Sequence, residues 1–243
     1  MIVLAAGMPR AGSGWHYNLA HDLMVAGGAA DAREIRRRYH LGRFLTQVNC
    51  NIGALTINRL GPVMVPSLLG NTFTIKVHSG PTAAAEYLIR RGQIRPTYIY
   101  RDPRDALLSA YEYGQRAVDR GRPNAFSHLD TIEKAIGFMA EQLEVWERWT
   151  GMADCHSLRY EDLKTDYDNQ AANLAAFLEV DPKEPEAAAV LAQYRPEKAS
   201  AGDSGLHFVR GVSGRHKEKL TPEQQQLCLD AFGDMLDDMG YQP

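Results

Sequence analysis

Short apolar runs alternate with longer stretches of helical periodicity along this chain. Runs of apolar and β-branched residues predict strands at 2–6, 72–78, 97–100 and 156–160. Apolar positions at helical spacing predict helices, which we expect at 16–28, 31–44, 82–91, from Asp105 onward, and at 131–149, 168–179, 185–194 and 222–239. Because strands and helices alternate, we expect an α/β fold in which a parallel β-sheet is flanked by helices on both faces.

Two segments lack a regular pattern. Residues 45–70 are apolar but are interrupted by glycine and proline residues, which favours helix and loop lining a pocket over sheet. Residues 195–214 are rich in glycine, serine and charge, which predicts a loop or lid. Neither segment reads as a linker between domains, so we expect residues 1–243 to form one domain.

Polar residues and a glycine-rich loop follow the predicted strands. The loop at 7–14 follows the first strand, and His78, Arg101 and Tyr160 lie at the ends of the other three. In a parallel sheet, ligands bind at the carboxyl ends of the strands. We therefore expect these residues to share one edge of the sheet.

The glycine-rich loop leads directly into a helix. Glycines allow close backbone approach to a ligand, and the first amides of a helix have no partners inside the helix, so this arrangement binds phosphate or sulfate. Gly7 and Gly12 have the spacing of the GxxxxGK loop of ATP-hydrolysing enzymes, but Ser13 and Gly14 follow where lysine and a hydroxyl are required. A kinase is therefore disfavoured, and Arg10 supplies the basic group of this loop instead.

Composition narrows the class of protein further. A hydrophobic content of 44% and a charged content of 23% are ordinary for a soluble globular protein, and a net charge of -3 gives no support for nucleic-acid binding. The first apolar run is too short to span a membrane and lacks a basic leader, so no membrane association is expected. The three cysteines, Cys50, Cys155 and Cys228, show no metal-binding or CxxC spacing, which favours a cytoplasmic location.

Residues 9–15, with the sequence PRAGSGW, resemble the 5'-phosphosulfate loop (PKSGTTW) of sulfotransferases that use 3'-phosphoadenosine 5'-phosphosulfate (PAPS). The run Lys76-Val77-His78 resembles the basic-x-His element of the same family. Residues 100–105, together with Ser109, resemble its YxCRNPKDxxxS region, which binds the 3'-phosphate of the nucleotide.

Two later stretches complete the resemblance. Tyr160-Glu161-Asp162 resembles the YEDL element near the adenine, and residues 210–217 resemble the RKGxxGxWK segment that returns to the 3'-phosphate. The matches extend from residue 7 to residue 217. The chain is therefore identified as similar to the PAPS-dependent sulfotransferases, whose P-loop-kinase-like fold is related to that of nucleotide kinases.

The resemblance implies a reaction and a set of site residues. It implies transfer of a sulfuryl group from PAPS to an acceptor hydroxyl, with 3'-phosphoadenosine 5'-phosphate (PAP) as product and no metal required. His78 would be the general base, and Arg10 and Lys76 would stabilise the developing negative charge. The residues expected to contact the cofactor are Arg10, Ala11, Gly12, Ser13, Gly14, Trp15, Arg101, Ser109, Tyr160, Arg210 and Gly211. Trp15 and Tyr160 are equally compatible with core packing.

The chain departs from the family pattern in places that bear on cofactor binding. Arg10 replaces the usual lysine, and Gly14 stands where a hydroxyl is common. Val209 replaces a basic residue, and Arg215-His216 stands where Asp-Trp is typical, with His207 and His216 expected to be incidental. Two other hypotheses stay open: a small-molecule or nucleotide kinase of related fold, and a nucleotide-binding regulatory protein without chemistry.

The acceptor is not determined by the sequence. We expect it to meet the loops at 38–70, 111–128 and 199–209. Aromatic residues there would suit an apolar acceptor: Tyr39, Phe44, Tyr111, Tyr113 and Phe208. Arginines 36 to 38 would instead suit an anionic one. A phenol, an aliphatic alcohol and a sugar all remain candidates, and no motif indicates an oligomeric state.

Overall fold

The structure is a computed structural model that describes residues 1–198 and 212–242. Within these residues the chain forms a sheet of four parallel strands in the order β2-β1-β3-β4. The strands are β1 (Ile2–Gly7), β2 (Phe73–Val77), β3 (Ile94–Tyr100) and β4 (His156–Arg159). The predicted α/β class and parallel sheet are confirmed.

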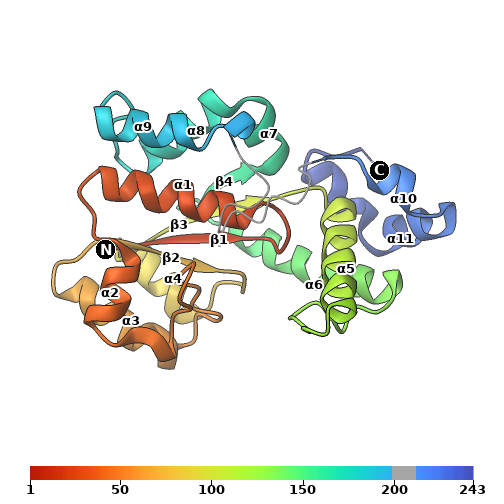
Figure 1. Cartoon of the computed structure of the whole chain (residues 1–243), viewed down its shortest axis with the longest axis horizontal. Coiled ribbons are helices and arrows are strands. Elements are labelled where there is room, and N and C mark those ends of the chain that lie inside the picture. The colour runs from red at the N-terminus through yellow and green to blue at the C-terminus, as the bar shows by residue number, and fades with distance from the viewer. Residues whose placement is uncertain (199–211, 243) are drawn as a thin grey trace.

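Helices cover both faces of this sheet. Figure 1 shows α1, α8 and α9 above the strands, and α2, α3 and α4 below them. Helices α5, α10 and α11 lie together at the end that carries the C-terminus. The bounds are α1 (Ser13–Ala26), α2 (Ala32–Arg38), α3 (Ile57–Leu68), α4 (Ala83–Arg90), α5 (Pro103–Asp119), α6 (Ile132–Thr150), α7 (Tyr160–Thr165), α8 (Tyr167–Phe177), α9 (Pro185–Gln193), α10 (His216–Lys219) and α11 (Pro222–Asp238). No helix in the described ranges combines the length and the apolar character needed to cross a membrane.

Three predicted boundaries are wrong for identifiable reasons. Helix α2 ends at Arg38 rather than residue 44 because His40 adopts a left-handed conformation, with φ of 53°. Strand β3 begins at Ile94 and so includes Pro96, which is tolerated because β4 pairs with β3 only from Thr97 onward. Tyr160 opens α7 instead of ending a strand.

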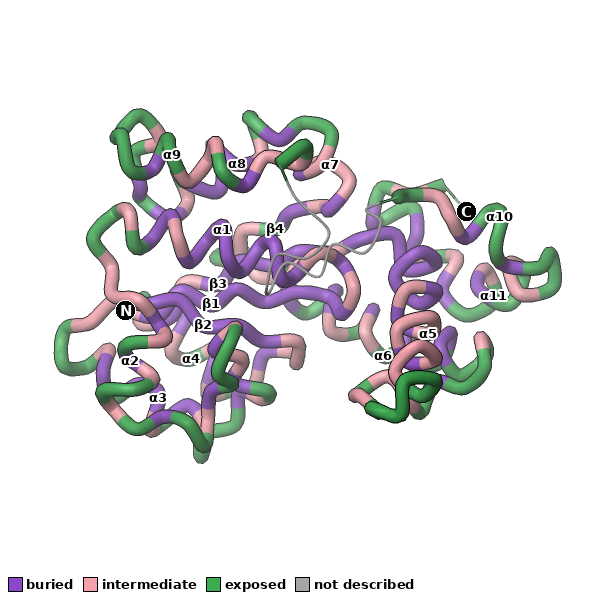
Figure 2. The backbone as a smooth tube through the Cα atoms, in the orientation of Figure 1, coloured by how far each residue is buried: buried purple, intermediate pink, exposed green. Residues whose placement is uncertain are grey.

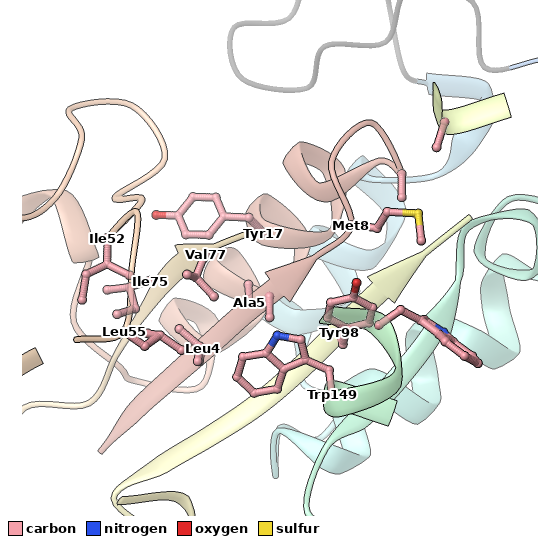
Figure 3. Packing of buried hydrophobic residues seen from close by; sticks show 14 of the residues in the cluster. Leu4, Ala5, Met8, Tyr17, Ile52, Leu55, Ile75, Val77, Tyr98 and Trp149 are labelled. Atoms are coloured by element: carbon pink, nitrogen blue, oxygen red, sulfur yellow. The ribbon is translucent and has the colours of Figure 1, made fainter. Parts of the chain in front are cut away.

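The core lies on both sides of the sheet. Every residue of β1 is buried, as expected for a central strand of a parallel sheet that is covered on both faces. Figure 2 shows the strands buried and the exposed residues concentrated on outer helices and loops. Tyr98 of β3 stacks on Trp149 of α6 with ring centroids 6.3 Å apart. Figure 3 shows the two side chains within the core. Such an aromatic pair contributes about 0.5–1.5 kcal/mol beyond its burial, and it holds α6 against the sheet.

The register of the strands brings their carboxyl ends to one level. Ala6 pairs with Val77, Gly7 with Ile99, and Tyr100 with Arg159. The residues that follow these strands therefore emerge along the same edge of the sheet.

The loop that follows α5 folds back onto that helix. Asn124 donates its side-chain N–H to the carbonyl of Tyr113, and Gln115 donates to the carbonyl of Leu129. Gly114 makes this close approach possible, because a Cβ at this position would collide with the carbonyl oxygen of Phe126. The loop and the second half of α5 thus form two walls that face one another.

We expect Gly114→Ala to lower the free energy of unfolding by about 1–3 kcal/mol, since the returning loop must move, and this exceeds the gain in helix propensity. Gly137→Ala is the matched control, because a Cβ there meets nothing within 4 Å on α6. This control should raise the free energy of unfolding by about 0.5–1 kcal/mol. Urea unfolding followed by circular dichroism measures both changes. Equal stabilisation of the two variants would contradict the tight contact.

Candidate functional site

A cavity of about 710 Å³ opens at the carboxyl edge of the sheet. It brings together nine of the residues singled out from the sequence, which come from the ends of different strands and from α5. They are Arg10, Gly12, Ser13, Gly14, Lys76, His78, Arg101, Ser109 and Tyr160. Among the described residues that line the cavity, seven are basic and one, Glu112, is acidic. The cavity therefore has a strongly positive potential.

The other expected contacts do not line this cavity or cannot be placed. Ala11 is fully buried, and Trp15 is only 1% exposed. Trp15 stacks on Tyr167 with ring centroids 6.0 Å apart and donates its indole N–H to the carbonyl of Tyr194. Trp15 of α1 thus packs in the core against α8. Arg210 and Gly211 lie outside the described residues.

The loop after β1 positions the start of α1 as an anion site. Arg10 and Gly12 both have left-handed backbones, with φ of 66° and 79°. Gly12 caps α1 without a side-chain hydrogen bond, and the first turn holds no acidic residue. The free amides and the positive end of the helix dipole therefore meet the cavity at Ser13 and Gly14. A side chain at Gly12 would also collide with the ring of Tyr160, so this approach requires glycine.

His78 is held in one orientation and one tautomer. Its Nδ1 lies 2.7 Å from the carbonyl oxygen of Gly7. A carbonyl only accepts hydrogen bonds, so Nδ1 carries the proton and Nε2 presents a lone pair. Burial and the charge of Lys76 lower the pKa of His78 to about 4, although the hydrogen bond to Gly7 opposes the shift. At neutral pH the ring is therefore a neutral proton acceptor.

Lys76 places an ammonium group in the same cavity. Lys76 as a whole is 5% exposed. In the part of the chain that the structure describes, its Nζ forms no hydrogen bond or ion pair. Burial, with a smaller contribution from the charge of Arg10, lowers the pKa of Lys76 to about 8. A buried cation of this kind is stabilised by an anion.

Arg10 links the first loop to α5. Its Nε donates to the hydroxyl of Ser109 at 3.2 Å, and its guanidinium lies 4.4 Å from the centre of the Tyr113 ring. Burial lowers the pKa of Arg10, but its ordinary value is so high that it stays charged. The stack and the hydrogen bond fix the guanidinium against α5 at the cavity wall.

Arg101 is oriented by the buried Asp105 and the half-buried Glu161. Its Nη2 donates to Asp105 at 3.2 Å and to the carbonyl of Val212 at 2.7 Å, and its Nε lies 3.6 Å from Glu161. Its guanidinium also lies 4.9 Å from the centre of the Tyr160 ring. Arg101 therefore presents its guanidinium group to the cavity in a fixed orientation.

Asp105 also holds the segment before α10. It accepts hydrogen bonds from the backbone of Gly214 at 2.6 Å and from the backbone and Nδ1 of His216, both at 3.0 Å. Burial by itself raises the pKa of a carboxyl, but these bonds and the charge of Arg101 bring the pKa of Asp105 down to about 2. His216 therefore anchors this segment from outside the cavity lining, a structural role that the sequence did not predict.

Sequence reasoning named the loops at 38–70 and 111–128 as facing the acceptor, but it did not single out most of the residues by which they line the cavity. These residues are Asn49, Asn51, Glu112, Arg116, Ala117, Arg120, Arg122, Asn124 and Phe126. The helical spacing of α5 onward from Ser109 was an available signal for several of them. Of the residues expected to meet an acceptor, only Tyr113 is among the described lining residues, while arginines 36 to 38 are not. Phe208 lies outside the described residues.

Comparison with known proteins gives a consistent result. A model of the sulfotransferase domain family matches residues 2–240. The fold is similar to that of a mouse sulfotransferase complexed with PAP, with a TM-score of 0.64 and 16% identity over 98% of this chain and 86% of that one. No curated protein sequence matches the chain.

Retinol dehydratase is a second protein of similar fold. Its complex with androsterone and the inactive cofactor PAP gives a TM-score of 0.62 and 15% identity, and covers 98% of this chain and 81% of that one. Its complex with retinol and PAP gives a TM-score of 0.60 and 16% identity with the same coverage. At these identities the structures show the shared fold, and the match over residues 2–240 shows the family.

We expect His78 to stay neutral, with its proton on Nδ1, from pH 8 down to about pH 5, because its pKa is lowered to about 4. Long-range ¹H–¹⁵N NMR correlation shows which ring nitrogen carries the proton, and the His78→Gln variant assigns the signal. A proton on Nε2, or titration near the ordinary value of about 6.5, would contradict the geometry.

Proposed function

The chain belongs to the sulfotransferase domain family, and we propose that it transfers a sulfuryl group from PAPS to a hydroxyl of a small-molecule acceptor and releases PAP. The observation that carries this proposal is the neutral His78, whose Nδ1 is held by Gly7 and which lines a cavity together with seven cationic side chains among the described residues. Transfer of an anionic group to a hydroxyl requires a neutral base that accepts the hydroxyl proton and, beside it, a site that binds anions.

The residues present fit a ligand with two separate anionic groups. The uncapped start of α1, Arg10 and Lys76 form one cationic centre, where the 5'-phosphosulfate of PAPS would be held. Arg101 and Ser109 form a second one on α5 and the end of β3, where the 3'-phosphate would be held. The unpartnered ammonium of Lys76 within the described residues supports this fit.

The chemistry divides between the ligand and the chain. When bound, PAPS supplies an activated sulfuryl group. His78 accepts the proton of the acceptor hydroxyl at Nε2, and its Nδ1–H bond to Gly7 keeps that nitrogen aimed into the cavity. Positioned general-base catalysis of this kind contributes about 100 to 10,000-fold. Arg10 and Lys76 hold fixed positive charge where negative charge develops.

We expect His78→Ala to lower kcat by about 100 to 10,000-fold while the dissociation constant for PAP changes little, because the imidazole acts on the acceptor. Transfer of ³⁵S from labelled PAPS to a panel of phenols, aliphatic alcohols and sugars measures turnover, and calorimetry measures PAP binding. His40→Asn is the control, since His40 is exposed, lies outside the lining of the cavity and has a left-handed backbone that asparagine adopts readily. Full turnover in His78→Ala would remove His78 from the role of base.

We expect PAP affinity to fall as the pH rises from 7 to 9.5. Free Lys76 loses its proton near pH 8, and the bound anion raises its pKa again, so binding above pH 8 takes up a proton. Calorimetric titration in two buffers of different ionisation enthalpy measures this uptake.

Lys76→Met should remove the proton uptake, and Lys134→Met should keep it, because Lys134 is more than half exposed and pairs with Asp130 outside the cavity. The same titration with ATP and magnesium tests the kinase hypothesis. Preference for ATP over PAP would replace the sulfotransferase proposal with that hypothesis.

A further inference from the structure

We propose that the acceptor of this sulfotransferase is a hydroxyl compound that also carries an anionic group, which Arg116, Arg120 and Arg122 bind at the far end of the cavity. The proposal rests on the proposed function, because it assigns the acceptor side of the same site. It names a carboxylate, sulfate or phosphate group as the feature that is recognised.

The first observation is the face that α5 turns toward the cavity. Ser109, Tyr113, Arg116 and Arg120 all line it, and their spacing of four, three and four residues places them on one side of a helix. Ser109 contacts Arg10, so the first of these residues lies beside the proposed cofactor site. The stripe then runs along α5 away from that site.

The backbone spacing carries the arginines beyond Ser109 along the helix axis. Arg116 lies seven residues beyond Ser109, or about 10 Å along the helix axis, and Arg120 lies about 16 Å beyond it. Arg122 follows on the returning loop, which Asn124 ties to the carbonyl of Tyr113. The three arginines therefore follow Ser109 along α5 and its loop, and the charge of Arg116 still reaches Arg10, whose pKa burial and this charge both lower.

The second observation is an uncompensated positive charge in this part of the cavity. Glu112 is the acidic residue among the described lining, and Arg215 holds both of its oxygens, at 2.5 and 3.2 Å. Arg116 approaches the same carboxylate at 3.5 Å. Arg120 and Arg122 form no ion pair with any residue in 1–198 or 212–242. Among the described lining residues, one carboxylate therefore accompanies four guanidinium groups on this side of the cavity.

The third observation is an aromatic wall between the two ends. Tyr113 and Phe126 meet edge to face with ring centroids 5.9 Å apart, and both line the cavity. Arg10 covers the Tyr113 ring at 4.4 Å, so this wall begins next to the proposed reaction centre. It would hold an apolar or aromatic body of the acceptor, with the hydroxyl toward His78 and the anionic group toward the arginines.

The test measures binding to the protein already saturated with PAP, so that the cofactor sites are filled. The probes are 4-hydroxyphenylacetate, its neutral amide, and the phosphonate of matching length. A second set, 6-hydroxyhexanoate and its amide, distinguishes a phenolic from an aliphatic acceptor. We expect the wild-type protein to bind the anionic member of at least one set about tenfold or more tightly than its amide, and to transfer the ³⁵S label to it.

Arg116→Gln combined with Arg120→Gln should remove this preference while binding of PAP and of the amide stays within about twofold. The control is Arg37→Gln combined with Arg38→Gln, which removes the same charge from two exposed residues of α2 outside the cavity lining. That control should keep the preference for the anion.

Three results would overturn the inference. Equal binding of anion and amide by the wild-type protein would exclude an anionic acceptor subsite. A large loss of PAP affinity in the Arg116 and Arg120 variant would assign these arginines to the cofactor instead. Absence of PAP binding to the wild-type protein would overturn the proposed function as well, whereas PAP binding without a preference for anions would overturn the inference alone.

Discussion

The site depends on the hydrogen bonds and the ion pair that the buried carboxylate of Asp105 forms. A charge in this position is stable only if it is fully paired, and Asp105 satisfies this requirement with the guanidinium of Arg101 and with donors from Gly214 and His216. These partners come from the end of β3 and from a segment more than one hundred residues later in the chain. One carboxylate therefore orients a cation of the cavity and fixes the segment that closes this side of the site.

Positive charge concentrated in one cavity is costly for the folded chain. The lowered pKa values of Lys76 and His78, about 8 and about 4, have burial as their main cause and neighbouring cations as an additional one. An anionic ligand would relieve this cost. The clustered cations therefore lower the free energy of unfolding of the empty protein and favour binding of an anion. The same logic makes His78 neutral at physiological pH, because a second buried cation beside Lys76 would be unfavourable.

Much of the fold could be predicted because its signals are local. The apolar run of β1, the start of α11 at Pro222 and the periodicity of α6 each lie within one stretch of sequence, and the structure confirms them. The boundaries of α2 and β3 were missed because they depend on the backbone of His40 and on which strands pair at Pro96. Such pairing is a property of neighbours that are distant in the sequence.

The sequence by itself determined the α/β class, the glycine loop before α1, and the placement of His78 and Arg101 after strands, because periodicity and turn chemistry act over a few residues. Only the tertiary structure decided that Trp15 packs in the core, that His216 pairs with Asp105, and that Arg116, Arg120 and Arg122 face the same cavity as Lys76. The reason is that burial and charge pairing are set by which distant segments the fold brings together, and no local pattern contains that information.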